Sequence, residues 1–133
     1  MIAKSEVMNL LVESCPSYKN RWIEYCKLNY SKGDEQLLYI DLGDFAYHVF
    51  DLYMNKESDE LQQVFDVIEQ LLIYGDEYVV EAVAIGLLED IQNIALSHNT
   101  NLEVFVQYLK PKTLNWWVKL FNFWNGTLKE DKA

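Results

Sequence analysis

Residues 35–74 read EQLLYIDLGDFAYHVFDLYMNKESDELQQVFDVIEQLLIY, and this stretch decides the fold class. Its apolar residues recur every three or four positions on both sides of a short polar turn, which is the period of an α-helix with one buried face. The pattern predicts helices over 35–54 and 58–74. Because their connection is short, the two helices should pack antiparallel. Their core faces carry Leu38, Leu42, Phe45, Ala46, Val49, Phe50 and Tyr53 in the first and Leu61, Val64, Phe65, Ile68, Leu71 and Leu72 in the second.

Carboxylates occupy the opposite face of each of these two helices. We call them the acidic ridges, and their members are Asp41, Asp44 and Asp51 on the first helix and Asp59, Asp66 and Glu69 on the second. Charged side chains are costly to bury without a partner. The spacing therefore predicts that both ridges face water.

The rest of the chain has the same helical period. We expect further helices near 4–14, 17–30, 77–97, 102–109 and 111–124. Four residues stand where helices should begin and have side-chain oxygens that suit an N-cap, namely Asp34, Ser58, Asp76 and Asn101. A length of 133 residues fits one domain. The sequence thus predicts an all-α single domain over 1–133, built of six to seven short helices packed mostly antiparallel.

Charge is distributed unevenly along the chain. The formal net charge is −10, and between Asp34 and Asp90 there are fifteen acids and one base, Lys56. Such a region repels nucleic acid and anionic membranes. It would attract a protein partner with a basic surface, and we expect the acidic ridges to be the residues that contact it. The alternative is that the ridges are solvated faces that only keep the protein soluble.

The N-terminal residues lack the apolar run of a signal peptide, and no stretch is long and apolar enough for a membrane span. We therefore expect a cytoplasmic protein with reduced cysteines. The two cysteines and two histidines match no zinc spacing. The sequence indicates neither a metal site nor a cofactor.

Catalytic residues are not evident in the sequence. Asp44, His48 and Asp51 share a helix face, where an aspartate one turn away can raise the pKa of a histidine. An open helix ridge provides no pocket, however, so the simpler interpretation is a solvated polar face. Cys15 and Cys26 have no evident link to either histidine. We expect a protein that is not an enzyme.

A polar group interrupts the apolar helix predicted over 77–97. It consists of Glu89, Gln92 and Asn93. If these side chains are buried, they must form hydrogen bonds with neighbouring helix ends or loops. The alternative is that they line a polar pocket.

Three segments carry a resemblance to a known family. They are DLGDFAYHVFDLY at 41–53, EYVVEAVAIGLLEDIQNIA at 77–95 and FVQYLKPKTLNWWVKLFNFWNG at 105–126. Over roughly 35–126 the chain resembles a family of small, acidic, uncharacterised bacterial proteins that are candidate immunity proteins of polymorphic toxin systems. The resemblance implies sequestration of a cognate toxin, and it assigns no catalytic residues to positions of this sequence.

Two other functions remain open at this stage. The first is a small-molecule binder or enzyme that uses a pocket around Glu89, Gln92 and Asn93. The second is a homodimeric scaffold that associates through the tryptophan-rich C-terminal helix, since tryptophan is a favoured interface anchor. The same aromatic residues, which include Trp116, Trp117 and Trp124, could equally close the core.

Overall fold

The computed structural model describes the backbone of residues 1–132 and the side chains of residues 1–123. Within this part the chain is helical and contains no strand, so the all-α prediction is confirmed. The main helices are α1 (Val7–Ser14), α2 (Lys19–Asn29), α3 (Leu38–Met54), α4 (Ser58–Tyr74), α5 (Glu77–Glu81), α6 (Glu89–Ser97) and α7 (Pro111–Lys132). Shorter helical turns are η1 (Lys4–Glu6), η2 (Pro16–Tyr18), the π-helical η3 (Ala82–Leu88) and η4 (Leu102–Tyr108).

Helices α3 and α4 form the predicted hairpin and bury the predicted apolar faces, apart from the partly exposed Tyr53. The start of α3 lies three residues later than the pattern suggested. Asp34 does not cap it, because its carboxylate accepts the Ser31 N–H at 2.8 Å and closes a turn before the helix. Ser58 is also not an N-cap but the first helical residue.

Helices α5, η3 and α6 form one continuous rod over 77–97. Asp76 caps its start, as predicted, by accepting the Val79 N–H at 2.9 Å. Two glycines lie where α3 packs on this rod. A Cβ at Gly86 would come within 3.1 Å of the Tyr39 ring, and one at Gly43 within 3.5 Å of the Asp90 carboxylate. The missing side chain at Gly86 therefore lets α3 approach the rod closely, whereas Gly43 leaves room for a Cβ.

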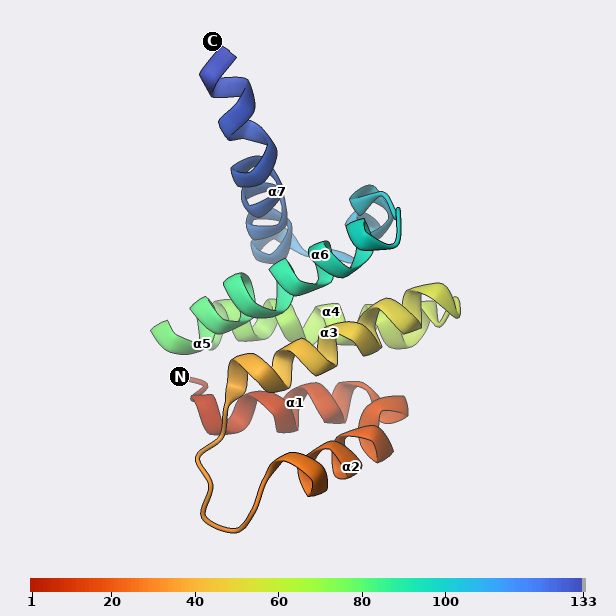
Figure 1. Ribbon diagram of the computed structural model, residues 1–133, viewed down its shortest axis with the longest axis vertical. Coiled ribbons are helices and arrows are strands. Elements are labelled where there is room, and N and C mark those ends of the chain that lie inside the picture. Colours follow the sequence, from red (N-terminus) through yellow and green to blue (C-terminus); the bar gives the residue numbers. More distant parts are fainter. Residues whose placement is uncertain (133) are drawn as a thin grey trace.

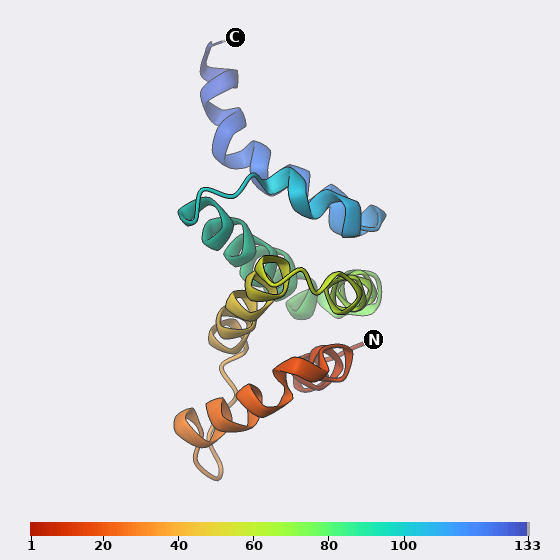
Figure 2. The same cartoon turned by 90° about the vertical axis from the view of Figure 1, so that its right-hand side faces the viewer.

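The helices are stacked in succession along the long axis of the molecule (Figure 1). The α1–α2 pair lies at the bottom, α3 and α4 follow, and α6 and α7 lie above them, as the perpendicular view also shows (Figure 2). Helix α4 packs on α1, α3 and α7, while α3 packs on η3 and α6. The core runs between these layers.

The N-terminal residues are tied to the turn between α4 and α5. The Ile2 N–H donates to the Tyr74 carbonyl at 2.7 Å, and the Ile2 carbonyl accepts the Asp76 N–H at 2.9 Å. These bonds fix the start of the rod that carries the candidate site. Among the described residues, no helix combines the length and the apolar character needed to cross a membrane.

Candidate interaction site

Asp41 of the first acidic ridge does not face water. It is fully buried and accepts hydrogen bonds from the hydroxyls of Tyr25 at 2.9 Å and Tyr30 at 2.6 Å. The Gln36 amide donates a third bond at 3.1 Å. Burial and the bond to Asp41 raise the pKa of Tyr30 to about 12. Asp41 therefore holds α2 and the following loop against α3.

Asp44 is also engaged inside the molecule. Its carboxylate accepts the Tyr18 hydroxyl at 2.6 Å and lies 3.0 Å from an Arg21 guanidinium nitrogen. Asp51 lies 3.7 Å from the other terminal nitrogen of Arg21 and stays exposed. One arginine from α2 thus neutralises much of the first ridge.

The second ridge, like the first, has both buried and exposed members. Glu69 is buried and accepts three hydrogen bonds from Lys112 and Thr113 at the start of α7. Asp66 lies 3.2 Å from the Lys110 ammonium and accepts a bond from Gln62, whereas Asp59 is exposed. The expectation that both ridges face water is therefore wrong for Asp41 and Glu69. Helical spacing located the polar faces correctly, but α2 and α7 cover parts of them.

His48 forms no hydrogen bond with an aspartate of its own helix. Its Nε2 lies 2.8 Å from the Ser17 hydroxyl instead. Burial and the charge of Arg21 lower the pKa of His48. An aspartate-raised pKa is therefore not found, because burial, and after it the charge of Arg21, outweighs the effect of the nearby carboxylates.

The polar group of α6 is not gathered into one pocket. Gln92 is buried, and its amide donates to the Trp117 carbonyl at 3.0 Å, which joins α6 to α7. Asn93 is exposed, and Glu89 is half-buried. Glu89 lines a cavity whose lining includes neither Gln92 nor Asn93.

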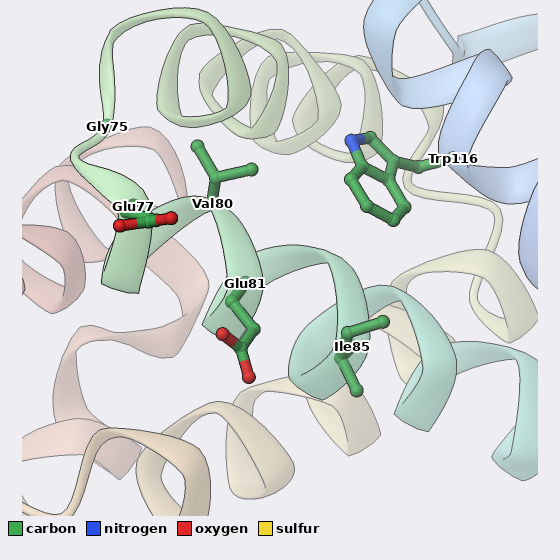
Figure 3. Close-up of a pocket in the computed structure, with 6 residues that line it drawn as sticks. All are labelled: Gly75, Glu77, Val80, Glu81, Ile85 and Trp116. Atoms are coloured by element: carbon green, nitrogen blue, oxygen red, sulfur yellow. The ribbon is translucent and has the colours of Figure 1, made fainter.

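Two adjoining cavities lie between the 77–97 rod and α7. The first, of about 430 Å³, is lined by Gly75, Glu77, Val80, Glu81, Ile85 and Trp116. The second, of about 300 Å³, is lined by Ile85, Glu89, Trp116, Lys119, Leu120 and Phe123. Because they share Ile85 and Trp116, we treat them as one surface and call it the acidic groove. In Figure 3 the Trp116 indole comes from α7 and faces the helix that carries Val80 and Ile85.

The groove combines an apolar floor with a row of acids. Glu77, Glu81, Ile85 and Glu89 follow one another at intervals of four residues, so they share one helix face. Within the described part of the chain, none of these three glutamates takes part in an ion pair. The single base in the lining is Lys119, whose ammonium lies over the Trp116 ring at 4.9 Å from its centre. The groove thus presents unneutralised negative charge beside exposed apolar surface.

The groove was not predicted from the sequence, although the residues that line it along the rod recur every four positions. Most of the apolar residues of the 77–97 segment are buried. Glu77, Glu81 and Ile85 are exposed because α7 covers only one side of the rod. Trp117 closes the core, with 2% of its surface exposed, whereas Trp116 is half-buried in the groove. Trp124 lies outside the described side chains.

Comparison with known proteins gives a family but no described relative. No significant match was found among curated proteins or among solved structures. Residues 8–125 match the family described as a domain of unknown function, DUF7674. The match extends further towards the N-terminus than the resemblance over 35–126 and takes in α1 and α2. Because it spans most of the 133 residues, the chain belongs to the DUF7674 family.

Proposed function

We propose that this protein is a protein-binding module that holds a basic segment of its partner in the acidic groove. One observation carries the proposal: Glu77, Glu81 and Glu89 line an apolar floor and, among the described residues, have no cationic partner. Carboxylates that are not neutralised within the protein attract lysine and arginine side chains of another molecule.

The spacing of the residues along the groove favours a helical segment as the occupant. An amphipathic helix binds a groove by inserting apolar residues one turn apart, with polar residues beside them. The glutamates lie along one helix face, and Val80, Ile85 and Trp116 supply apolar contacts. A partner helix with lysine or arginine at intervals of about one turn would complement both features.

The resemblance to candidate immunity proteins supports a toxin as this partner. Many toxins that act on nucleic acids or anionic substrates have basic surfaces, which an acidic protein can block. In this proposal the groove sequesters the basic surface of a cognate toxin. The remaining exposed ridge acids, Asp51 and Asp59, would add to the long-range field that speeds association.

Co-expression with the product of the adjacent gene tests this proposal, with purification through a tag on this protein. The test variant is Glu77→Lys/Glu81→Lys, and the matched control is Asp51→Lys/Asp59→Lys. Both variants replace two acids by two lysines, so the change in net charge is equal. Each pair also contains one acid in the first turn of a helix and one exposed acid elsewhere. We expect the groove variant to lose the partner and the control to retain it at moderate salt.

Two results would contradict the proposal in different ways. If the unaltered protein fails to co-purify with or protect against the neighbouring product at low as well as moderate salt, the toxin partner is wrong. If the control variant loses binding and the groove variant keeps it, the exposed ridge acids are the interface and the groove is not.

A further inference from the structure

A second cluster of reactive side chains lies far from the acidic groove. Cys15 follows the end of α1, His48 lies on α3 and Glu60 lies in the first turn of α4. One ligand atom from each residue lies within 4.8 Å of the other two. Three elements that are distant in sequence therefore bring a thiol, an imidazole and a carboxylate to one point.

Ser17 lies among these three groups and links them. Its hydroxyl donates to Glu60 Oε2 at 2.7 Å and lies 2.8 Å from His48 Nε2 and 3.8 Å from Cys15 Sγ. The Ser17 N–H also donates to Glu60 Oε2, at 2.9 Å. Because Glu60 accepts the hydroxyl proton, His48 Nε2–H is the group that donates to the Ser17 oxygen. Nε2 therefore faces the centre of the cluster, and when a metal binds there the neutral ring must carry its proton on Nδ1 instead.

This arrangement does not fit a nucleophilic triad. In such a triad the carboxylate orients the histidine, and the histidine takes the proton of the nucleophile. Here Glu60 bonds to Ser17 and not to the histidine. The shared feature of the cluster is instead that its donor atoms converge on one point, which is what a metal site requires.

We propose that Cys15, His48 and Glu60 form a binding site for a divalent transition metal, with Zn²⁺ as the preferred ion. Thiolate sulfur, imidazole nitrogen and carboxylate oxygen are the three ligand types that zinc takes from proteins. Zinc–ligand bonds of about 2.0–2.3 Å place neighbouring ligands about 3.3–3.6 Å apart in a tetrahedral site. The three atoms need to close by only about 1 Å, which side-chain rotations supply. Ser17 must then turn aside or become the fourth ligand.

The proposed ligands bind a metal in their deprotonated forms, which are thiolate, neutral imidazole and carboxylate. Cys15 is buried, and its sulfur lies 3.8 Å from the Ser17 hydroxyl. The metal must therefore displace the thiol proton, which leaves to solvent.

Titration of the metal-free protein with Co²⁺ and Zn²⁺ tests the site. Co²⁺ replaces zinc and gives visible ligand-field bands for a tetrahedral site and a charge-transfer band when a thiolate is bound. We expect both at one equivalent, with Zn²⁺ displacing Co²⁺. Cys15→Ser should abolish the charge-transfer band, and His48→Gln should weaken Zn²⁺ binding by more than about a hundredfold, since loss of even an outer partner costs 10- to 100-fold.

Cys26→Ser and His98→Ala are the matched controls, because they change the other cysteine and the other histidine. Both should keep the cobalt spectrum. The proposal is overturned if the unaltered protein gives no charge-transfer band, if Cys15→Ser retains it while folded by circular dichroism, or if Cys26→Ser removes it. Should Cys15→Ser fail to fold, the His48→Gln titration decides in its place, and unchanged Zn²⁺ affinity there would overturn the site.

Discussion

Glu69 of α4 and Thr113 of α7 are joined by two hydrogen bonds of 2.8 Å, which the Thr113 N–H and hydroxyl donate to Glu69 Oε1. The Lys112 N–H donates to the other oxygen at 3.1 Å. The first N–H groups of a helix have no partner within the helix, and its N-terminus favours negative charge. Glu69 therefore caps α7 from a different helix and fixes the position of Trp116 in the groove.

Replacing Glu69 by glutamine should destabilise the protein. The amide keeps one acceptor oxygen, but its NH₂ group would face an N–H donor and the favourable charge would be lost. A buried donor without an acceptor costs about 1–3 kcal/mol, so we expect a decrease of this size in the free energy of unfolding. Urea titration measures it, with Gln70→Ala at the neighbouring exposed position as a control that should change little. An equal effect of both changes would mean that the cap adds nothing specific.

Alkaline pH should unfold the protein through the tyrosines bonded to Asp41. Burial and the Asp41 bond raise the pKa of Tyr30 to about 12 and raise that of Tyr25 further. A raised pKa in the folded state contributes stability that is complete below the ordinary tyrosine pKa of about 10. This contribution is lost as pH rises through the folded value. Stability should therefore fall from about pH 10 upwards.

The Asp41→Asn variant separates this effect from general alkaline unfolding. Without the carboxylate, the Tyr25 and Tyr30 hydroxyls lose a charged acceptor, and their pKa values should move down towards that of free tyrosine. Tyrosinate absorbance against pH measures the shift, and urea titration should show a loss of about 1–3 kcal/mol at neutral pH. An unchanged absorbance titration would show that burial alone sets these pKa values.

Two glycines should respond to alanine in opposite directions. In the interior of α3, Gly43→Ala places a Cβ at ordinary contact distance from Asp90, 3.5 Å. Alanine favours a helix over glycine by about 0.5–1 kcal/mol, so stability should rise by about that amount. At Gly75 a Cβ would clash with the Leu71 carbonyl and lie 2.5 Å from a Val79 methyl. Gly75→Ala should therefore cost at least about 1–3 kcal/mol. Thermal unfolding of the two variants side by side tests both signs.

Local pattern was sufficient to predict the main helices because their periodicity is encoded within a few residues, although two of the four predicted caps were wrong. The segments predicted over 58–74 and 77–97 have the bounds observed for α4 and for the α5–η3–α6 rod. The start of α3 was misplaced because Asp34 caps a turn and not the helix, a choice that its own spacing does not reveal.

The candidate sites depend on contacts that sequence spacing does not encode. Asp41 and Glu69 have the spacing of exposed acids, and only the arrival of Tyr25, Tyr30 and Thr113 from other helices buries them. Cys15 and His48 belong to segments whose proximity follows from how α1, α3 and α4 pack. The spacing of the groove glutamates, in multiples of four residues, is present in the sequence. Their exposure, however, depends on where α7 lies.

Asp90, next to Glu89 of the groove, should limit the stability of the protein at neutral pH. Burial, and after it the charge of Glu89, raises the pKa of Asp90, and among the described residues it forms no ion pair. A raised pKa favours the protonated folded state, so stability is greatest below the ordinary aspartate pKa and falls as pH rises through the folded value.

Asp90→Asn removes this charge and should raise the free energy of unfolding at about pH 7 but not at about pH 3, below the ordinary aspartate pKa of about 3.9. Glu81→Gln, on the same helical rod but exposed, is the control and should change stability little at either pH. Urea titration at both pH values measures the difference. A lower stability of Asp90→Asn at neutral pH would mean that the carboxylate makes a favourable contact.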